Sequence, residues 1–404
     1  MIPADAWTVA DPTVCEICGR DSCEDHLPPE GEPTATTTRR LIAHRAVDVI
    51  AEAPPTEILE GIAWARNVSV VASESGVGKT FVLLDAGAAV ADGVAWHGRE
   101  VQPGSVVYVS FEGDALGLRL KALRDHVGRR LEHLYIVRAH DPISPRVTRD
   151  GEERSLGEIT LAAALTTLTE ELAAAERPPI VLGVIDTVRA SLTGSEDSSE
   201  SVSAYLRAVR RLLVHLPHAA VILAHHSGWQ DGGDTQRKRE RGSSAWRGNC
   251  DGTLYLEAGT YDPDRREAPL SLRALKVRDG ERPPPLHLIR RRVELLEMDR
   301  YGEPVTSCVI ERDRRTREDR DAERAQVVNL ANRATDGAVL QAMQAYPDAT
   351  SISRLRPYVG LRTEDVSAAV ARILRAGWAT EGKRGQPYTV TAAGEARIRR
   401  EEQP

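Results

Sequence analysis

The chain has 404 residues, enough for two or three domains, and its 41% hydrophobic and 28% charged residues are typical of a soluble globular protein. Its net charge of −7 gives no overall positive field that points to nucleic acid, so any basic surface must be local. No apolar run approaches the roughly 20 residues of a membrane span, and residues 1–11 lack a signal-peptide pattern. We therefore expect a cytoplasmic protein with no membrane partner.

Residues 1–38 are rich in Pro, Thr, Glu and Asp and contain few large apolar side chains, so they cannot bury enough surface to fold alone. Within them a C-x2-C-x4-C-x2-H pattern offers four zinc ligands, and a bound Zn²⁺ would supply the missing folding energy. Structural zinc sites usually separate their ligand pairs more widely, so a flexible tail with free thiols remains the alternative. The candidate ligands are Cys15, Cys18, Cys23 and His26.

Residues 67–80 read N-V-S-V-V-A-S-E-S-G-V-G-K-T, which is an apolar strand, a loop of small residues and the start of an Ala-rich helix. This order is the context of a phosphate-binding P-loop, G-x-x-x-x-G-K-[ST], with Ser73 in place of the first Gly. Backbone N–H groups would hold the phosphates, Lys79 would reach the β- and γ-phosphates, and Thr80 would bind Mg²⁺. The expected nucleotide-binding residues are Ser73, Glu74, Ser75, Gly76, Val77, Gly78, Lys79 and Thr80.

Three further apolar runs, residues 105–111, 180–185 and 220–224, read as buried strands that alternate with helices near 157–176 and 202–215. This alternation predicts an α/β fold, a mostly parallel β-sheet flanked by helices. Ligands bind outside the carboxyl ends of such strands, where Glu112, Asp186 and a His pair follow the three runs.

Each carboxylate has a chemical role available to it. Glu112 could orient and deprotonate a water molecule, and Asp186 could hold Mg²⁺. A carboxylate that ends a strand is more often a helix cap or a solvated group. The agreement of the whole set favours a nucleotide-hydrolysing site.

The rest of the chain divides into an extension of the sheet, a linker and a small unit. Alternating patterns at 253–257, 270–277 and 286–293 predict a terminal antiparallel extension, which completes a domain of residues 39–310. Residues 311–325 mix both charges without an apolar stripe and are predicted to be a solvated helix or a linker, and residues 311–335 are taken as the boundary between domains.

Residues 336–404 contain patterns for three short helices and a hairpin, the parts of a winged helix-turn-helix. Ten Lys and Arg against six Asp and Glu between residues 336 and 400 make this unit locally basic. A winged helix that docks on protein is the alternative to one that binds DNA. The DNA-contact candidates are Arg362, Arg372, Arg375, Lys383 and Arg384.

From about Pro54 to Val293 the chain resembles the RecA-like ATPases of the RepA-type hexameric replicative helicases, within the AAA domain group. The resemblance is carried by S-E-S-G-V-G-K-T, W-H-G-R-E-V-Q-P-G-S-V-V-Y-V-S-F-E-G-D, V-L-G-V-I-D-T, L-A-H-H-S-G and R-G-S-S-A-W-R-G-N-C-D. It implies a RecA-like fold, ATP and Mg²⁺ as ligands, single-stranded DNA as a partner, and a homo-oligomer that is a hexameric ring or a filament.

The same resemblance implies roles for single residues. Lys79 and Thr80 match the Walker A pair, Glu112 the catalytic carboxylate and Asp186 the Walker B carboxylate. His226 resembles the sensor of the γ-phosphate, although a core imidazole remains the alternative. Arg241 matches an arginine finger, and Lys276 and Arg278 resemble a Lys-x-Arg element; both elements would reach the ATP of a neighbouring subunit.

The basic loop before Arg241 is predicted to line a DNA channel through Arg237, Lys238 and Arg239, because clustered cations neutralise phosphates. A merely solvated basic loop is the other interpretation. Taken together, the sequence favours a replicative or accessory DNA helicase. The alternatives are a recombination or repair ATPase that forms filaments without unwinding, and an ATP-gated DNA-binding regulator.

Overall fold

The computed structural model describes residues 45–51, 54–112, 116–148, 151–226, 245–278, 280–382 and 386–401. By backbone contacts the chain divides into two units, Met1–Pro54 and Pro55–Pro404. The first contributes helix α1 (Ala46–Ile50) to the described residues. The four candidate zinc ligands lie outside the described residues.

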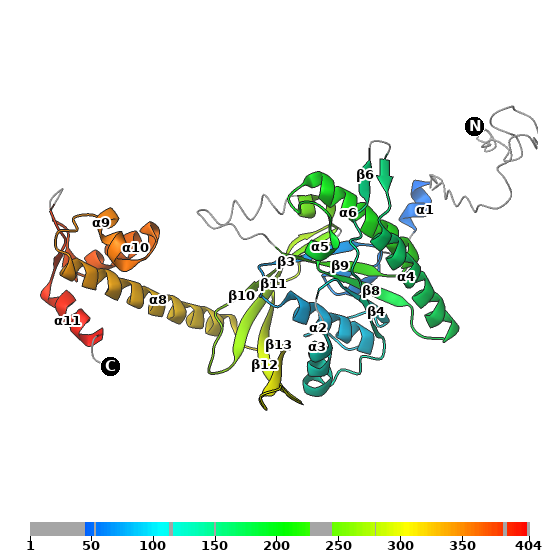
Figure 1. The fold of residues 1–404 in the computed structure, drawn as a ribbon, viewed down its shortest axis with the longest axis horizontal. Helices are drawn as coiled ribbons and strands as arrows, with labels where there is room; N and C mark the ends of the chain where they lie inside the picture. The colour runs from blue at the N-terminus through cyan, green and yellow to red at the C-terminus, as the bar shows by residue number, and fades with distance from the viewer. Residues whose placement is uncertain are drawn as a thin grey trace, which may run out of the picture. The chain divides into compact units, whose positions relative to one another are not determined.

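A nine-stranded sheet forms the centre of the second unit, in the order β13-β12-β11-β10-β3-β9-β8-β4-β5 (Figure 1). The six strands from β10 to β5 are parallel, and β11, β12 and β13 continue the sheet in antiparallel fashion. The bounds are β3 Val68–Ser73, β4 Ser105–Ser110, β5 Leu134–Arg138, β8 Ile180–Asp186, β9 Ala220–His226, β10 Gly252–Ala258, β11 Glu267–Val277, β12 Leu286–Met298 and β13 Pro304–Arg312.

Helices cover both faces of this sheet because its central strands are apolar on both sides. In β3, Val71 packs into the core that contains α2, whereas Val70 packs into the core that contains α4 and α6. The predicted α/β sheet flanked by helices is therefore confirmed. The helices are α2 Lys79–Asp92, α3 Leu116–Ala122, α4 Leu156–Ala174, α5 Val188–Ser191 and α6 Ser199–Leu212, with a π-helical turn Leu123–Val127 and a 3-10 turn Leu213–His215.

The antiparallel extension differs from the prediction in two ways. Strand β10 joins the parallel strands beside β3, and the Val68 N–H donates to Asp251 just before β10 (2.9 Å). Strand β13, which was not predicted, forms the outer edge beside β12. Alternation of polar and apolar residues reveals a half-buried strand but not its partner or its direction, which explains the difference.

Helix α8 (Arg317–Ala345) runs without a break through the predicted linker into the small C-terminal unit. A capping box between Thr316 and Asp319 starts it, and its buried residues begin near Asp336, which is why only its last part shows an apolar stripe in the sequence. Within the described ranges, no helix is both long and apolar enough to cross a bilayer.

The C-terminal unit has its own apolar core, formed by α8, α9, α10, α11 and the β14–β15 pair. The remaining small elements are two two-stranded sheets, β1–β2 and β6–β7. Their bounds, with those of the C-terminal elements, are β1 Glu57–Leu59, β2 Ala63–Trp64, β6 Arg146–Thr148, β7 Gly151–Glu153, α9 Ile352–Val359, α10 Thr363–Arg375, β14 Ala379–Thr380, β15 Thr389–Val390 and α11 Ala392–Glu401.

Candidate nucleotide-hydrolysing site

The predicted P-loop joins the end of β3 to the start of α2. Gly76 and Gly78 have φ of +77° and +112°, a backbone region that side chains disfavour. Gly78 is also the N-cap of α2 and offers no side chain to its first N–H groups. A helix start whose N–H groups lack a side-chain acceptor, next to a tight glycine loop, fits a phosphate group.

The Lys79 side chain is buried within this loop, with 5% of the residue exposed. Its ammonium donates to the Ser73 hydroxyl (2.8 Å) and lies 3.1 Å from Nδ1 of His226. The Ser73 hydroxyl in turn donates to the Glu74 carbonyl (2.8 Å). Ser73, the one departure from the motif, therefore holds the lysine rather than disturbing the loop.

Burial lowers the pKa of both basic side chains here, Lys79 and His226. Desolvation lowers the pKa of Lys79 to about 8, although the Asp186 and Glu112 carboxylates act in the opposite direction. Desolvation, and next the Lys79 charge, lower the pKa of His226 below its usual value. A neutral His226 can accept a hydrogen bond from the lysine ammonium at Nδ1.

This lowered pKa predicts the pH dependence of nucleotide binding. The protonated lysine attracts phosphate, and its population in the free protein falls as the pH rises past about 8. We expect the Kd for ADP, measured by calorimetry, to be steady near pH 7 and to rise about tenfold per pH unit above pH 8. Lys79→Arg keeps its charge and should flatten the profile. A level wild-type profile to pH 9 would contradict the prediction.

Asp186 ends strand β8 and is 4% exposed. Its Oδ2 accepts hydrogen bonds from the hydroxyls of Thr80 (2.8 Å) and Tyr108 (2.6 Å). Its Oδ1 is buried and has no hydrogen-bond partner among the residues that the structure describes. A carboxylate oxygen with spare capacity beside a threonine hydroxyl is a donor set that suits Mg²⁺, which usually takes one or two protein ligands and completes its shell with phosphate and water.

Asp186→Asn should remove most of the Mg²⁺-dependent part of nucleotide affinity. The amide can keep the hydrogen bonds from Thr80 and Tyr108 but lacks the negative charge that a divalent cation requires. We expect the Kd for ADP in EDTA to stay within about twofold of wild type, and the gain on adding Mg²⁺ to fall by about tenfold or more. An unchanged Mg²⁺-dependent gain would exclude Asp186 as a metal ligand.

Glu112 follows strand β4 and contacts the residue that comes directly after the end of the neighbouring strand, β8. Its Oε1 accepts a hydrogen bond from the Thr187 hydroxyl (2.6 Å), and Thr187 directly follows Asp186. The Phe111 N–H donates to the Asp186 carbonyl (2.8 Å), which fixes the two strand ends together. The carboxylate is thus oriented by a hydroxyl while the residue stays exposed to solvent.

Strand register places these groups side by side at the carboxyl ends of the central parallel strands. Ser73 pairs with His226, and Asp186 pairs with Ser110 on one side and Ala224 on the other. The predicted P-loop, both carboxylates and His226 therefore come together in space.

Lys276 and Arg278 lie at the other end of the strands. Their neighbour Val277 pairs with Gly252, which pairs with Ser69 near the start of β3. The Lys276 ammonium donates to the carbonyls of Arg247 and Cys250 (both 2.7 Å), and Arg278 forms an ion pair with Asp251 (2.5 Å). Within one chain, both residues therefore lie near the amino end of β3, whereas the P-loop lies at its carboxyl end.

The predicted DNA contacts fall into three groups. Arg362, the N-cap of α10, and Arg375, the last residue of that helix, are exposed. Arg372 instead forms an ion pair with Asp336 of α8 (2.7 Å), which packs the two helices together. The remaining candidates lie outside the described residues: Arg237, Lys238, Arg239, Lys383 and Arg384, together with the predicted finger Arg241.

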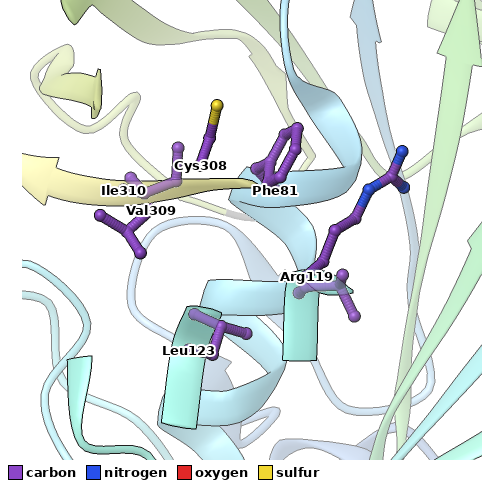
Figure 2. A pocket seen from close by; sticks show the side chains of 7 residues that line it. Phe81, Arg119, Leu123, Cys308, Val309 and Ile310 are labelled. Atoms are coloured by element: carbon purple, nitrogen blue, oxygen red, sulfur yellow. The ribbon is translucent and has the colours of Figure 1, made fainter. Parts of the chain in front are cut away.

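A small hollow flanks the start of α2, on the side of α3 and β13 (Figure 2). Phe81, which follows Thr80, lies against it, and the Arg119 guanidinium is 5.0 Å from the centre of the Phe81 ring. Cys308 lines the same hollow, and burial raises the pKa of its thiol.

Three residues at the site were not predicted: Tyr108, Thr187 and Arg290. Tyr108 is fully buried, and burial followed by the Asp186 charge raises the pKa of its hydroxyl well above the usual value, so it donates to that carboxylate. The Asp-Thr dipeptide at the end of β8 is the sequence feature that could have indicated a role for Thr187. Arg290 contacts the P-loop from β12, and nothing in the local sequence indicates this.

The α/β sheet flanked by helices and the P-loop at the end of β3 support a P-loop ATPase domain of the RecA-like type. Residues 35–232 match a family model described as AAA domain, and this match covers the P-loop, Glu112, Asp186 and His226. A search of curated proteins returned no match to the chain.

Proposed function

We propose that this protein is an ATP-dependent DNA motor, a replicative or accessory helicase of the RepA type that hydrolyses Mg-ATP at subunit interfaces. The observation that supports hydrolysis best is the meeting of three groups at the carboxyl ends of the strands: the P-loop, the Oδ1 of Asp186, which lacks a partner among the described residues, and the oriented carboxylate of Glu112. These are the parts that phosphoryl transfer to water requires.

Each side chain has a defined task in this proposal. Lys79 and the N–H groups of the P-loop hold the β- and γ-phosphates. Thr80 and Asp186 hold Mg²⁺, which neutralises charge on the phosphates when bound. Glu112 orients the attacking water and accepts its proton, while the Thr187 hydroxyl keeps the carboxylate in place.

We propose that His226 senses the nucleotide. Its Nδ1 lies 3.1 Å from the ammonium of Lys79, so a γ-phosphate that draws this lysine changes the hydrogen bonding of His226. His226 ends β9, and the basic loop with Arg237, Lys238 and Arg239 follows it in the chain. We propose that this loop contacts single-stranded DNA and receives the signal through His226.

The positions of the remaining cations support the proposed oligomer. Lys276 and Arg278 lie at the opposite strand ends from the P-loop of their own chain. A contact between them and ATP therefore requires the nucleotide of a neighbouring copy. With Arg241 as the finger, this arrangement calls for a ring or a filament of identical subunits.

The C-terminal unit has the order of elements that a winged helix requires, helices α8, α9 and α10 followed by the β14–β15 pair. The exposed Arg362 and Arg375, at the two ends of α10, support contact with DNA phosphates. If this unit docks on protein instead, residues 330–404 will show no salt-dependent binding to DNA.

The proposal is tested by ATPase activity with and without single-stranded DNA, a strand-displacement assay and the mass of the assembly. A helicase should show stimulation by DNA, ATP-dependent displacement and a mass of several subunits. Stimulation without displacement would indicate a filament-forming ATPase. ATPase activity that DNA does not change would indicate a nucleotide-gated regulator.

A further inference from the structure

An arginine from the antiparallel extension holds the P-loop from outside. Nη1 of Arg290, in β12, donates to the carbonyls of Gly76 (2.7 Å) and Val77 (2.9 Å). In the sheet, β11 and β10 separate β12 from β3, the strand that carries the loop. The contact therefore joins β12 to the loop after β3, although these two strands are not adjacent in the sheet.

The arginine side chain packs closely along the loop. A Cβ built on Gly78 would lie 3.1 Å from Cδ and 3.2 Å from Nη1 of Arg290. Within the described part of the chain, no ion pair with a carboxylate is formed by Arg290. The guanidinium is thus committed to the loop backbone rather than to a neighbouring acid.

Peptide geometry connects this contact to phosphate binding. A trans peptide is planar, so its N–H points away from its C=O. Fixing the Gly76 carbonyl fixes the direction of the Val77 N–H, and fixing the Val77 carbonyl does the same for the Gly78 N–H. These N–H groups belong to the set that a P-loop turns toward phosphate.

We propose that Arg290 is a positioning residue that orients the N–H groups of Val77 and Gly78 toward the nucleotide phosphates. It acts from the carbonyl side of the loop, opposite to the N–H groups that it orients. The proposal rests on the proposed function insofar as a nucleotide is the ligand. It makes the antiparallel strands part of the nucleotide site rather than an accessory layer.

The test compares Arg290→Met with Arg290→Lys and with a matched control, Arg292→Met. Arg292 lies two residues along the same strand, is exposed, and has no side-chain contact with the loop within the described residues. Methionine keeps the length and packing of the arginine stem but cannot donate hydrogen bonds. Lysine can still donate to at least one carbonyl.

Two readouts are needed in the full chain. The first is the Kd for ADP: we expect a rise of about tenfold or more in Arg290→Met, because a bond to a charged donor is lost. Arg290→Lys should recover part of the lost affinity, and the Kd of Arg292→Met should stay within about twofold of the wild-type value. The second is the NMR order parameter of the Val77 amide in the nucleotide-free protein, which should fall from about 0.85 toward 0.6 in Arg290→Met.

The two readouts separate the possible results. A lower unfolding temperature with wild-type ADP affinity and an unchanged Val77 amide would make Arg290 a plain tether of β12 and overturn the proposal. If the wild-type chain binds no nucleotide, the proposed function fails. The Val77 amide then still decides whether Arg290 orients the loop.

Discussion

Glu112→Gln should lower kcat for ATP hydrolysis by about 10³, within the range for loss of a general base, and leave the Kd for ATP within about twofold. The amide is the same size as the carboxylate and can still accept the hydrogen bond from Thr187. It cannot accept a proton from water. Single-turnover phosphate release and nucleotide binding measured on one preparation separate the two effects.

The matched control for this variant is Glu196→Gln. Glu196 is a further carboxylate near the site: its charge acts on Lys79 and His226, and it lies 3.7 Å from Nδ1 of His225. We expect a much smaller loss of kcat from it. If Glu196→Gln stops hydrolysis while Glu112→Gln does not, Glu196 is the general base and the assignment of Glu112 is wrong.

Arg241→Ala should also lower kcat by about 10³ or more, the low end of the effect of an arginine finger, with ATP binding retained. Among the described residues, the arginine that contacts the P-loop is Arg290, and it binds carbonyl oxygens rather than facing the phosphates. We propose that Arg241 of a neighbouring copy supplies a further cation for the developing charge on the γ-phosphate. Unchanged turnover would exclude Arg241.

A mixing experiment distinguishes a finger in trans from one in cis. Lys79→Ala subunits keep the finger but lack a working P-loop, and Arg241→Ala subunits have the reverse defect. Each should be inactive alone, and their mixture should regain activity at interfaces where an intact finger meets an intact P-loop. No recovery in mixed assemblies would contradict hydrolysis between subunits.

The P-loop and the residues at the strand ends could be predicted because their signals are local. A strand, a small-residue loop and Lys79-Thr80 follow one another within fourteen residues, and buried strands end directly at Asp186 and His226. Parallel strands bring such ends to one edge whatever the details of the packing. The order of elements was therefore enough to predict which residues meet at these strand ends.

The contacts that orient the site could not be predicted, since they join residues far apart in the sequence. Arg290 reaches Gly76 from three strands away, and Tyr108 reaches Asp186 from a neighbouring strand. Strand β13 and the unbroken α8 were missed for a related reason. The first part of α8 is charged and has no apolar stripe, and the apolar residues of β13 do not alternate regularly with polar ones, so neither segment carries a clear periodic signal.

The most direct measurement of the central claim is phosphate release from ATP by the purified full chain, with Mg²⁺ and with EDTA, in the presence and absence of single-stranded DNA. Increasing subunit concentration should be tested in parallel. We predict release that requires Mg²⁺, rises with DNA and increases more than proportionally with subunit concentration. Absence of release under all these conditions, or release unaffected by EDTA, would contradict the account.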